Sequence, residues 1–317
     1  MSSFIRDLIN LIRVRQYYKN ALVFVGLFFS QSLLNFEYYP TLILGFILLC
    51  FTSSINYIIN DISDIEKDKK HPEKLKKKPL ASGDLSKGFA VFLILILASF
   101  IIFSLIFLIP NWSFFVLIVL IIITGQLYNH LFKQHAFIDI LSLSTGYLWR
   151  ALAGCVIIEQ YISAWLFLSI YEVALFLVIA KRKGDLLILG GKENATEHKK
   201  VYNQYSLKLL DQFHVIIAGS IFITYSLYLI FRFNLFTPEE VIINEYIAIL
   251  TVPITLYILM RYMYLTSAKP EIARNTEKAF LDKGIIIAGL ILGGVLLYSF
   301  YFDQIINFIN LIFNFNL

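Results

Sequence analysis

Nine long apolar segments, separated by short polar connections, constrain the fold of this chain more than any other feature of its sequence. A helix needs about 20 apolar residues to cross the roughly 30 Å hydrocarbon core of a bilayer. Soluble domains average about 25% charged residues, whereas this chain has 15% charged and 58% hydrophobic residues. The sequence therefore predicts an all-α, polytopic membrane protein. The nine predicted spans are residues 20–36, 41–61, 88–109, 112–129, 136–158, 162–181, 211–233, 243–265 and 284–312.

The first predicted span is short enough to have a second interpretation. Its apolar run from Ala21 to Leu34 resembles the core of a secretory signal peptide. No small-x-small cleavage site follows it, and Glu37-Tyr-Tyr-Pro40 leads directly into the next apolar run. We therefore expect a retained helix. Because no segment has the composition of a soluble domain, residues 1–317 are predicted to form a single integral membrane domain.

The cations of the chain lie almost entirely on one side of the predicted membrane. Of the 27 Lys and Arg residues, 25 lie in the N-terminal segment or in every second connection; the exceptions are Arg150 and Arg232. Connections rich in Lys and Arg stay in the cytoplasm, which predicts a plasma-membrane protein with a cytoplasmic N-terminus. Because these are also the long connections, we expect the active site there. The predicted active-site loops are approximately residues 61–87, 130–135, 181–210 and 266–283.

The remaining composition excludes several classes of function. The net charge of +5 is too small to indicate a nucleic-acid partner. Cys50 and Cys155 both lie in apolar runs, which argues against a disulfide framework. The five histidines are scattered without the spacing of metal ligands. A metal site built from His and Cys is therefore not predicted.

A row of carboxylates stands at the end of the second predicted span. Asp61, Asp64 and Asp68 fall within about 60° of one another on a helix, and Asn60 widens the arc to about 100°. The sequence predicts that one face of this helix is polar, because the same stripe continues back through Tyr57 and Ser53. Three like charges this close repel one another unless a cation holds them. Oxygen ligands without His or Cys suit Mg²⁺, which usually binds through one or two carboxylates and substrate phosphates. The alternative is a solvated helix end whose acids offset the neighbouring lysines.

The pattern Asn60-Asp61-x-x-Asp64-x-x-x-Asp68 resembles the first aspartate-rich motif of the UbiA-type intramembrane prenyltransferase superfamily. This resemblance implies nine transmembrane helices around a central cavity. It also implies that Asp61, Asp64 and Asp68 hold Mg²⁺ and bind a diphosphate substrate at the cytoplasmic side. Prenyl-transferring members carry a second motif, D-x-x-x-D, near the sixth-to-seventh connection. This chain has Lys181-Arg182-Lys-Gly-Asp185 there instead.

With this difference the chain resembles one branch of the superfamily, the decaprenyl-phosphate phosphoribosyltransferases. The branch implies Mg-dependent transfer of a 5-phosphoribosyl group from phosphoribosyl diphosphate to a polyprenyl phosphate, with release of diphosphate, in contact with membrane lipid. Tyr17 replaces a Trp and Lys78 an Arg of the branch pattern. The matching segments are Arg13-Val-Arg15-Gln16-Tyr-Tyr18-Lys19-Asn20, His71-Pro72-x-Lys74, Pro79-Leu80-Ala81-Ser82-Gly83, Tyr128-x-x-x-x-Lys133, Arg150-Ala-Leu-Ala-Gly154, Ser163-x-Trp165-Leu166, Lys181-Arg182-x-x-Asp185-Leu186 and Pro270-Glu271 with Asp282.

The resemblance also assigns substrate-binding positions. The donor carries a 5-phosphate that a prenyl diphosphate lacks, so extra cations are expected at Lys181 and Arg182; an ordinary charge cluster at a membrane edge is the alternative. Arg150 and Glu172 lie at similar depths inside predicted spans, where an unpaired charge is costly. We expect them to face the bundle interior, where they either pair or contact substrate. The substrate-binding set is Lys19, Asn60, Lys74, Tyr128, Lys133, Asp139, Arg150, Lys181, Arg182 and Asp185.

Two other functions remain as alternatives. The first is a prenyltransferase that moves a prenyl group from a prenyl diphosphate to an aromatic or glycerol-phosphate acceptor, which the missing D-x-x-x-D motif disfavours. The second is a transporter or channel. Short outer connections and the lack of paired, interrupted half-helices argue against it.

Overall fold

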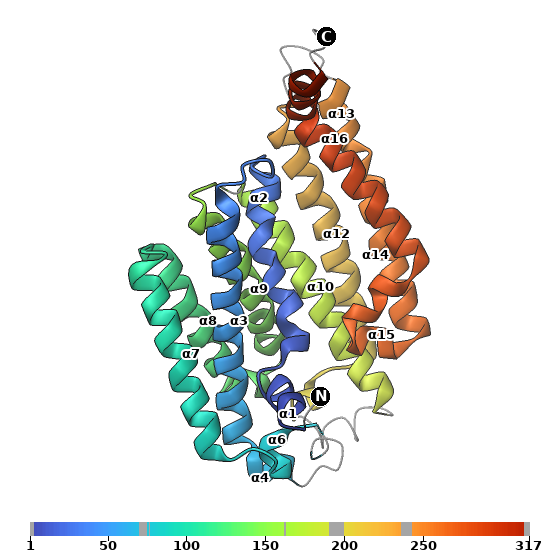
Figure 1. The fold of residues 1–317 in the computed structure, drawn as a ribbon. Helices are drawn as coiled ribbons and strands as arrows, with labels where there is room; N and C mark the ends of the chain where they lie inside the picture. The colour runs from blue at the N-terminus through green and yellow to red at the C-terminus, as the bar shows by residue number, and fades with distance from the viewer. Residues whose placement is uncertain are drawn as a thin grey trace. The chain divides into compact units, whose positions relative to one another are not determined.

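A computed structural model describes residues 3–69, 75, 77–161, 163–189, 200–235 and 243–313. Every regular element in these ranges is a helix (Figure 1), which confirms the predicted all-α class. The predicted substrate residue Lys74 lies outside the described residues, as do positions 190–199 of the third predicted loop.

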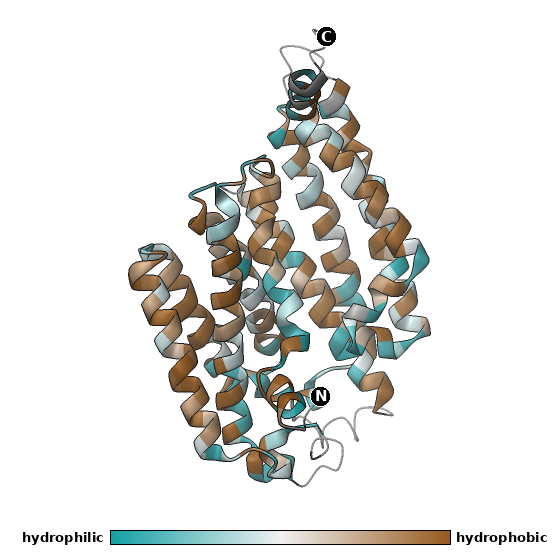
Figure 2. Cartoon of the chain, in the orientation of Figure 1, coloured by the Kyte–Doolittle hydropathy of each residue, from teal (hydrophilic) through white to brown (hydrophobic). Residues whose placement is uncertain are grey.

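Eight helices in the described ranges are long and apolar enough to cross a membrane. They confirm eight of the nine predicted spans and indicate an integral membrane protein. Figure 2 shows α7 (Lys87–Phe107) coloured as hydrophobic along most of its length, as expected for a helix that faces lipid. The eight helices are Tyr38–Ser63, Lys87–Phe107, Trp112–His130, Ile138–Ile157, Ala164–Ile188, Leu207–Arg232, Glu245–Ala268 and Lys283–Asn307.

The first predicted span, residues 20–36, has a different structure. A 3-10 helix, η1 (Val14–Phe24), runs into a short α-helix, α2 (Val25–Phe29). The helix stops near Gln31, which takes a positive φ of 60°. Polar side chains explain the difference, because Asn20 is buried and hydrogen-bonded. A segment that buries polar groups against its neighbours need not be a lipid-exposed α-helix.

The chain folds into two compact units. Unit 1 comprises residues 1–133 and 145–161, and unit 2 comprises residues 134–144 and 162–317. The helix α9 (Ile138–Ile157) contributes residues to both. The prediction of one domain over residues 1–317, and that of a central cavity, stay predictions.

Unit 1 is built around α3 (Tyr38–Ser63), which packs against η1, α7 and α8. Its buried face carries Leu42, Leu48 and Ile58. Side chains of Ser86 and Asn111 accept hydrogen bonds from the first turns of α7 and α8 and so set where these helices begin. The other elements of this unit are α1 (Ser3–Leu11), α4 (Ile65–Asp68), α6 (Pro79–Ser82), α7 (Lys87–Phe107), α8 (Trp112–His130) and most of η2 (Phe132–Gln134).

Unit 2 is built around α10 (Ala164–Ile188), which packs against α12 (Leu207–Arg232) and α15 (Pro270–Arg274). Ser206 caps the N-terminus of α12 by accepting a hydrogen bond from Leu209 N. The remaining elements are η3 (Lys200–Gln204), α13 (Ile243–Ile249), α14 (Thr251–Ala268), η4 (Thr276–Leu281) and α16 (Lys283–Phe313).

Gly154 of α9 lets the backbone of η1 approach closely within unit 1. A Cβ at this position would lie 1.7 Å from the carbonyl oxygen of Val23. Because backbone atoms would have to move, we expect Gly154→Ala to lower the free energy of unfolding by about 1–3 kcal/mol, the usual cost of overpacking. Thermal unfolding in detergent micelles measures this. Gly289→Ala is the control, since nothing lies within 4 Å of its added Cβ, and equal stability of the two variants would contradict the prediction.

Candidate functional site

One face of α3 is polar over its last three turns, as the sequence predicts. Ser53 accepts a hydrogen bond from Arg150, and the Tyr57 ring lies 4.5 Å from the Arg13 guanidinium carbon. Asp61 follows and accepts a hydrogen bond from Arg13 at 2.7 Å. We call Ser53, Tyr57 and Asp61 the α3 polar stripe. These contacts all come from cations of unit 1.

Lys78 joins the first and last carboxylates of the predicted motif. Its Nζ lies 2.8 Å from Asp61 Oδ1 and 2.5 Å from Asp68 Oδ2. The Asp61 and Asp68 side chains are only 3% and 2% exposed, so both buried charges are compensated by this ammonium, with Arg13 as a further partner of Asp61. Pro79, the first residue of α6, fixes the backbone directly after Lys78. The Lys78 ammonium thus lies between the carboxylates of Asp61 and Asp68, which would otherwise repel each other.

Asp64 is the more accessible member of the row. Its side chain is 20% exposed, and its oxygens lie 3.5 Å from Lys67 Nζ and 4.0 Å from Lys133 Nζ. These distances are longer than those around Asp61. Asp64 stands just past the end of α3, at the break before α4. It is therefore the carboxylate best able to accept a new ligand.

The carboxylate oxygens of the row are suitable ligands for Mg²⁺, although the three carboxylates do not meet around one point. No group of three or more His, Cys, Asp or Glu among the described residues could hold a metal ion. Mg²⁺ typically takes one or two protein carboxylates and completes its shell with substrate phosphates and water. Asp61 and Asp64 supply such oxygens, whereas Asp68 is held by Lys78. The residues present fit an ion that binds together with a diphosphate.

The remaining predicted residues of unit 1 lie at several places. Lys19 follows Tyr18 in η1, with its Nζ 5.9 Å from that ring centroid. Asn60 stands in the last turn of α3, and its carbonyl oxygen accepts the Asp64 N–H. Tyr128 is half-buried in α8. Their assignment to substrate stays a prediction.

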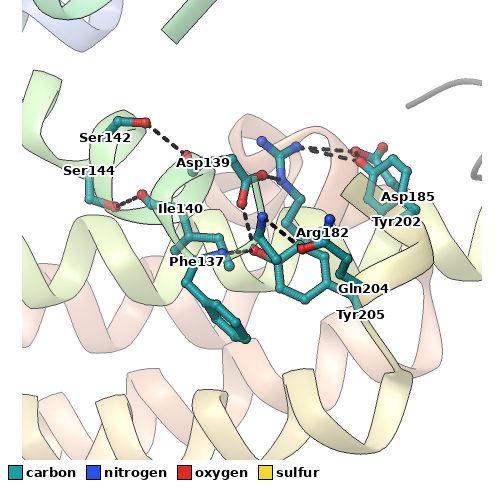
Figure 3. A network of polar contacts seen from close by, with 11 residues as sticks. Phe137, Asp139, Ile140, Ser142, Ser144, Arg182, Asp185, Tyr202, Gln204 and Tyr205 are labelled. Carbon is teal, nitrogen blue, oxygen red and sulfur yellow. Dashed lines mark hydrogen bonds and ion pairs between the residues drawn. The ribbon is translucent and has the colours of Figure 1, made fainter. Parts of the chain in front are cut away.

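In unit 2 the structure brings together three predicted residues, one of them distant in sequence from the other two (Figure 3). Arg182 Nε donates to Asp139 Oδ2 at 2.7 Å, and the two residues are 1% and 0% exposed. Arg182 also lies 3.8 Å from Asp185. The charge of Arg182 is thus neutralised inside the protein, so we assign Arg182 and Asp139 a positioning role, with their contact to substrate still a prediction.

Two tyrosines complete this network. Tyr205 donates to Asp139 at 2.6 Å, and Tyr202 donates to Asp185 at 2.6 Å. Burial raises the pKa of both hydroxyls well above the ordinary value, so they remain protonated donors at neutral pH. These bonds tie η3 and the residue that follows it to the start of α9 and the end of α10. We call Asp139, Arg182, Asp185, Tyr202 and Tyr205 the arginine network.

Sequence reasoning missed several charged residues at these two places. Arg13 and Lys78 contact the carboxylate row, and Arg274 lies 3.6 Å from Asp185. Arg13 and Lys78 do stand in the segments that resemble the family, which was the one available signal. Lys181, which sequence reasoning did select, is exposed on α10.

Arg150 and Glu172 form separate hydrogen bonds with neutral partners and not the ion pair that was one of the expectations. Arg150 finds neutral partners inside unit 1. Glu172 accepts hydrogen bonds from Ser220 and Thr224 of α12, both at 2.6 Å. Two hydroxyl donors satisfy the carboxylate within unit 2, so the expected ion pair is replaced by hydrogen bonds in each unit.

These features define an integral membrane protein with a carboxylate row and cations at the end of one helix. The chain belongs to the UbiA prenyltransferase family, which matches residues 21–281. This membership confirms the predicted superfamily and the prediction of a transferase enzyme.

Among curated proteins, the chain is similar to two named decaprenyl-phosphate phosphoribosyltransferases. It is 27% identical over 224 residues to the one from Corynebacterium glutamicum, covering 70% of this chain and 66% of the relative. It is 28% identical over 234 residues to the one from Mycolicibacterium smegmatis, covering 71% and 70%. The matched region therefore spans about two thirds of these relatives.

Solved structures support the fold. A UbiA homologue from Archaeoglobus fulgidus bound to DMAPP and Mg²⁺ superposes with a TM-score of 0.66 at 15% identity, covering 93% of this chain and 98% of that chain. A digeranylgeranylglyceryl phosphate synthase gives a TM-score of 0.58 at 21% identity, covering 93% and 97%. At these identities the likeness establishes the fold alone.

Proposed function

We propose that this protein transfers the 5-phosphoribosyl group of phosphoribosyl diphosphate to a polyprenyl phosphate and releases diphosphate. The observation that carries the proposal is the set of cations around the carboxylate row. Asp61, Asp64 and Asp68 have Arg13, Lys78 and Lys133 within 4.0 Å. Such a mixture suits a ligand that carries several phosphate charges. The names of the two curated relatives support phosphoribosyl transfer to a polyprenyl phosphate.

The reaction exchanges one C–O bond for another. An oxygen of the acceptor phosphate forms a bond to C1 of the ribosyl group while the bond from C1 to the diphosphate oxygen breaks. The electron pair of the broken bond leaves with diphosphate, and no proton needs to move. The acceptor phosphate is already ionised near pH 7, so no dedicated base is required of the protein.

The protein would accelerate this exchange chiefly through electrostatics and orientation. In this proposal, Lys133 and Arg13 stabilise the negative charge that grows on diphosphate as it leaves. Mg²⁺ bound by Asp61 and Asp64 would add Lewis-acid stabilisation of the same leaving group. Asp68, paired with Lys78, keeps that lysine close to Asp61. A cytoplasmic location of this end of α3, which the charge distribution favours, would give access to a water-soluble donor.

One assay tests the proposal against its main alternative. The purified chain in detergent is incubated with Mg²⁺ and phosphoribosyl diphosphate labelled in the ribosyl group, with and without polyprenyl phosphate. We expect lipid-extractable label only with the acceptor present, and at least about a tenfold loss when Mg²⁺ is chelated. Parallel reactions offer labelled prenyl diphosphate with an aromatic or glycerol-phosphate acceptor. Incorporation from these alone would replace the proposal with prenyl transfer.

A further inference from the structure

Arg150 is a positive charge placed well inside a membrane-spanning helix. It lies 12 residues after the start of α9, roughly 18 Å along the helix axis. Its Nε donates to Asn20 Oδ1 at 2.7 Å, one terminal nitrogen donates to Ser53 Oγ at 3.3 Å, and the other donates to the carbonyl oxygen of Gly146. All three acceptors are neutral.

No carboxylate lies within ion-pair distance of Arg150 among the residues that the structure describes. The buried arginine of unit 2, Arg182, differs because Asp139 neutralises it. A charge at membrane depth is costly unless a counter-ion or water compensates it. Arg150 is half-buried rather than enclosed, so an anion can reach it.

The groups around Arg150 are held in place before any ligand binds. Asn20 is 1% exposed and donates to Cys50 Sγ at 3.2 Å, and Ser53 is 6% exposed and donates to Asn20 Oδ1 at 3.3 Å. A guanidinium has five N–H donors, and the three bonds to protein use three of them. Within the described residues, two donors therefore remain for a ligand on a guanidinium whose orientation is fixed.

The position of this guanidinium relates it to the carboxylate row. Ser53 and Asp61 lie on the same stripe of α3, eight residues or roughly 12 Å apart along the axis. The guanidinium is thus placed about two turns inward from the proposed diphosphate site. Arginine forms two parallel hydrogen bonds to a phosphate group, which makes phosphate its natural ligand.

We propose that Arg150, oriented by Asn20 and Ser53, is a second anion site of unit 1 that binds a phosphate monoester. This inference rests on the proposed function, in which two substrates carry such a group: the 5-phosphate of the donor and the phosphate of the polyprenyl acceptor. The same hydrogen bonds suit both. The site would hold that phosphate apart from the departing diphosphate and so fix the distance over which the new bond forms.

The substitution Asn20→Asp separates this role from a structural one. It keeps the oxygen that Arg150 contacts but supplies the missing negative charge. If Arg150 only ties η1 to α9, the new ion pair leaves activity unchanged and preserves or raises the melting temperature. If Arg150 binds phosphate, Asn20→Asp raises the KM for one substrate at least about tenfold without loss of stability. Arg150→Lys, which keeps charge but loses the paired donors, is expected to raise the same KM.

Binding without turnover identifies which phosphate is recognised. Thermal unfolding of the full chain in detergent is followed with ribose 5-phosphate in one arm and with polyprenyl phosphate in the other. We expect one of them to raise the melting temperature of the unsubstituted protein, and Asn20→Asp to remove that shift. Arg232→Gln is the control, because Arg232 is exposed at the end of α12, and its shift should persist.

The outcomes separate the two proposals. A ligand shift that Asn20→Asp abolishes supports the anion site even if no ribosyl label is transferred, a result that would overturn only the proposed function. If neither compound shifts the melting temperature, or if both KM values stay within about twofold in Asn20→Asp and Arg150→Lys, the anion site is refuted.

Discussion

Replacing Asp61 with asparagine is expected to lower kcat/KM for phosphoribosyl transfer by at least about 10²–10³-fold, the loss seen when one electrostatic stabiliser of a transition state is removed. Asp61 accepts Arg13 at 2.7 Å and Lys78 at 2.8 Å on the same oxygen. The asparagine keeps the shape of the side chain but not its charge. It therefore weakens metal binding and releases two cations from their shared partner.

Steady-state rates with saturating Mg²⁺ measure this effect, and Glu66→Gln provides the matched control. Glu66 lies on α4 near the same row, its side chain is 82% exposed, and its partner Lys69 is also exposed. Its ion pair should contribute little, so we expect activity within about twofold of the unsubstituted protein. An Asp61→Asn variant that keeps more than about a tenth of the activity would remove Asp61 from the proposed site.

The second large effect concerns the stability of unit 2. Asp139→Ala removes the carboxylate that accepts a hydrogen bond from the buried Arg182 guanidinium, and it also removes the acceptor of the Tyr205 hydroxyl. Breaking a buried ion pair in this way costs about 3–5 kcal/mol. We expect that loss in the free energy of unfolding, measured in detergent micelles. The double variant Asp139→Leu with Arg182→Met should be more stable than Asp139→Ala, because it removes both charges together.

Glu271→Ala is the control for this prediction. Glu271 pairs with Lys278 at 3.0 Å, and the two side chains are 74% and 46% exposed. Exposed pairs contribute at most about 1 kcal/mol, so the loss should be correspondingly small. If Asp139→Ala and Glu271→Ala destabilise the protein equally, the arginine network does not anchor unit 2 as described.

The sequence predicted best what depends on local periodicity. The α3 polar stripe follows from the spacing of Ser53, Tyr57 and Asp61, because residues three or four apart share a helix face. Apolar segments of membrane-spanning length likewise predicted eight of the spans. Both properties depend on residues that are close together in the sequence. They can therefore be predicted without knowing which other segments pack against them.

The sequence could not predict which residues pair across the fold. Arg182 and Asp139 are 43 positions apart, and nothing in either segment indicates that one neutralises the other. The sequence did not distinguish Lys78 from the neighbouring lysines, although among the described residues it alone joins Asp61 to Asp68. The same limit explains the error at Glu172. Similar depth suggested an ion pair with Arg150, whereas hydroxyls of α12 satisfy the carboxylate.

Because η1 is wound as a 3-10 helix, its number of residues determines which side chains face inward. A 3-10 helix rises about 2.0 Å per residue and places every third side chain on one line. Tyr17, Asn20 and Val23 form such a line: Tyr17 bonds to Ser54, Asn20 to Arg150, and Val23 is fully buried. Adding or removing one residue would rotate the rest of the line by about 120°. The length of η1 is therefore as strictly determined as the identity of its inward-facing residues.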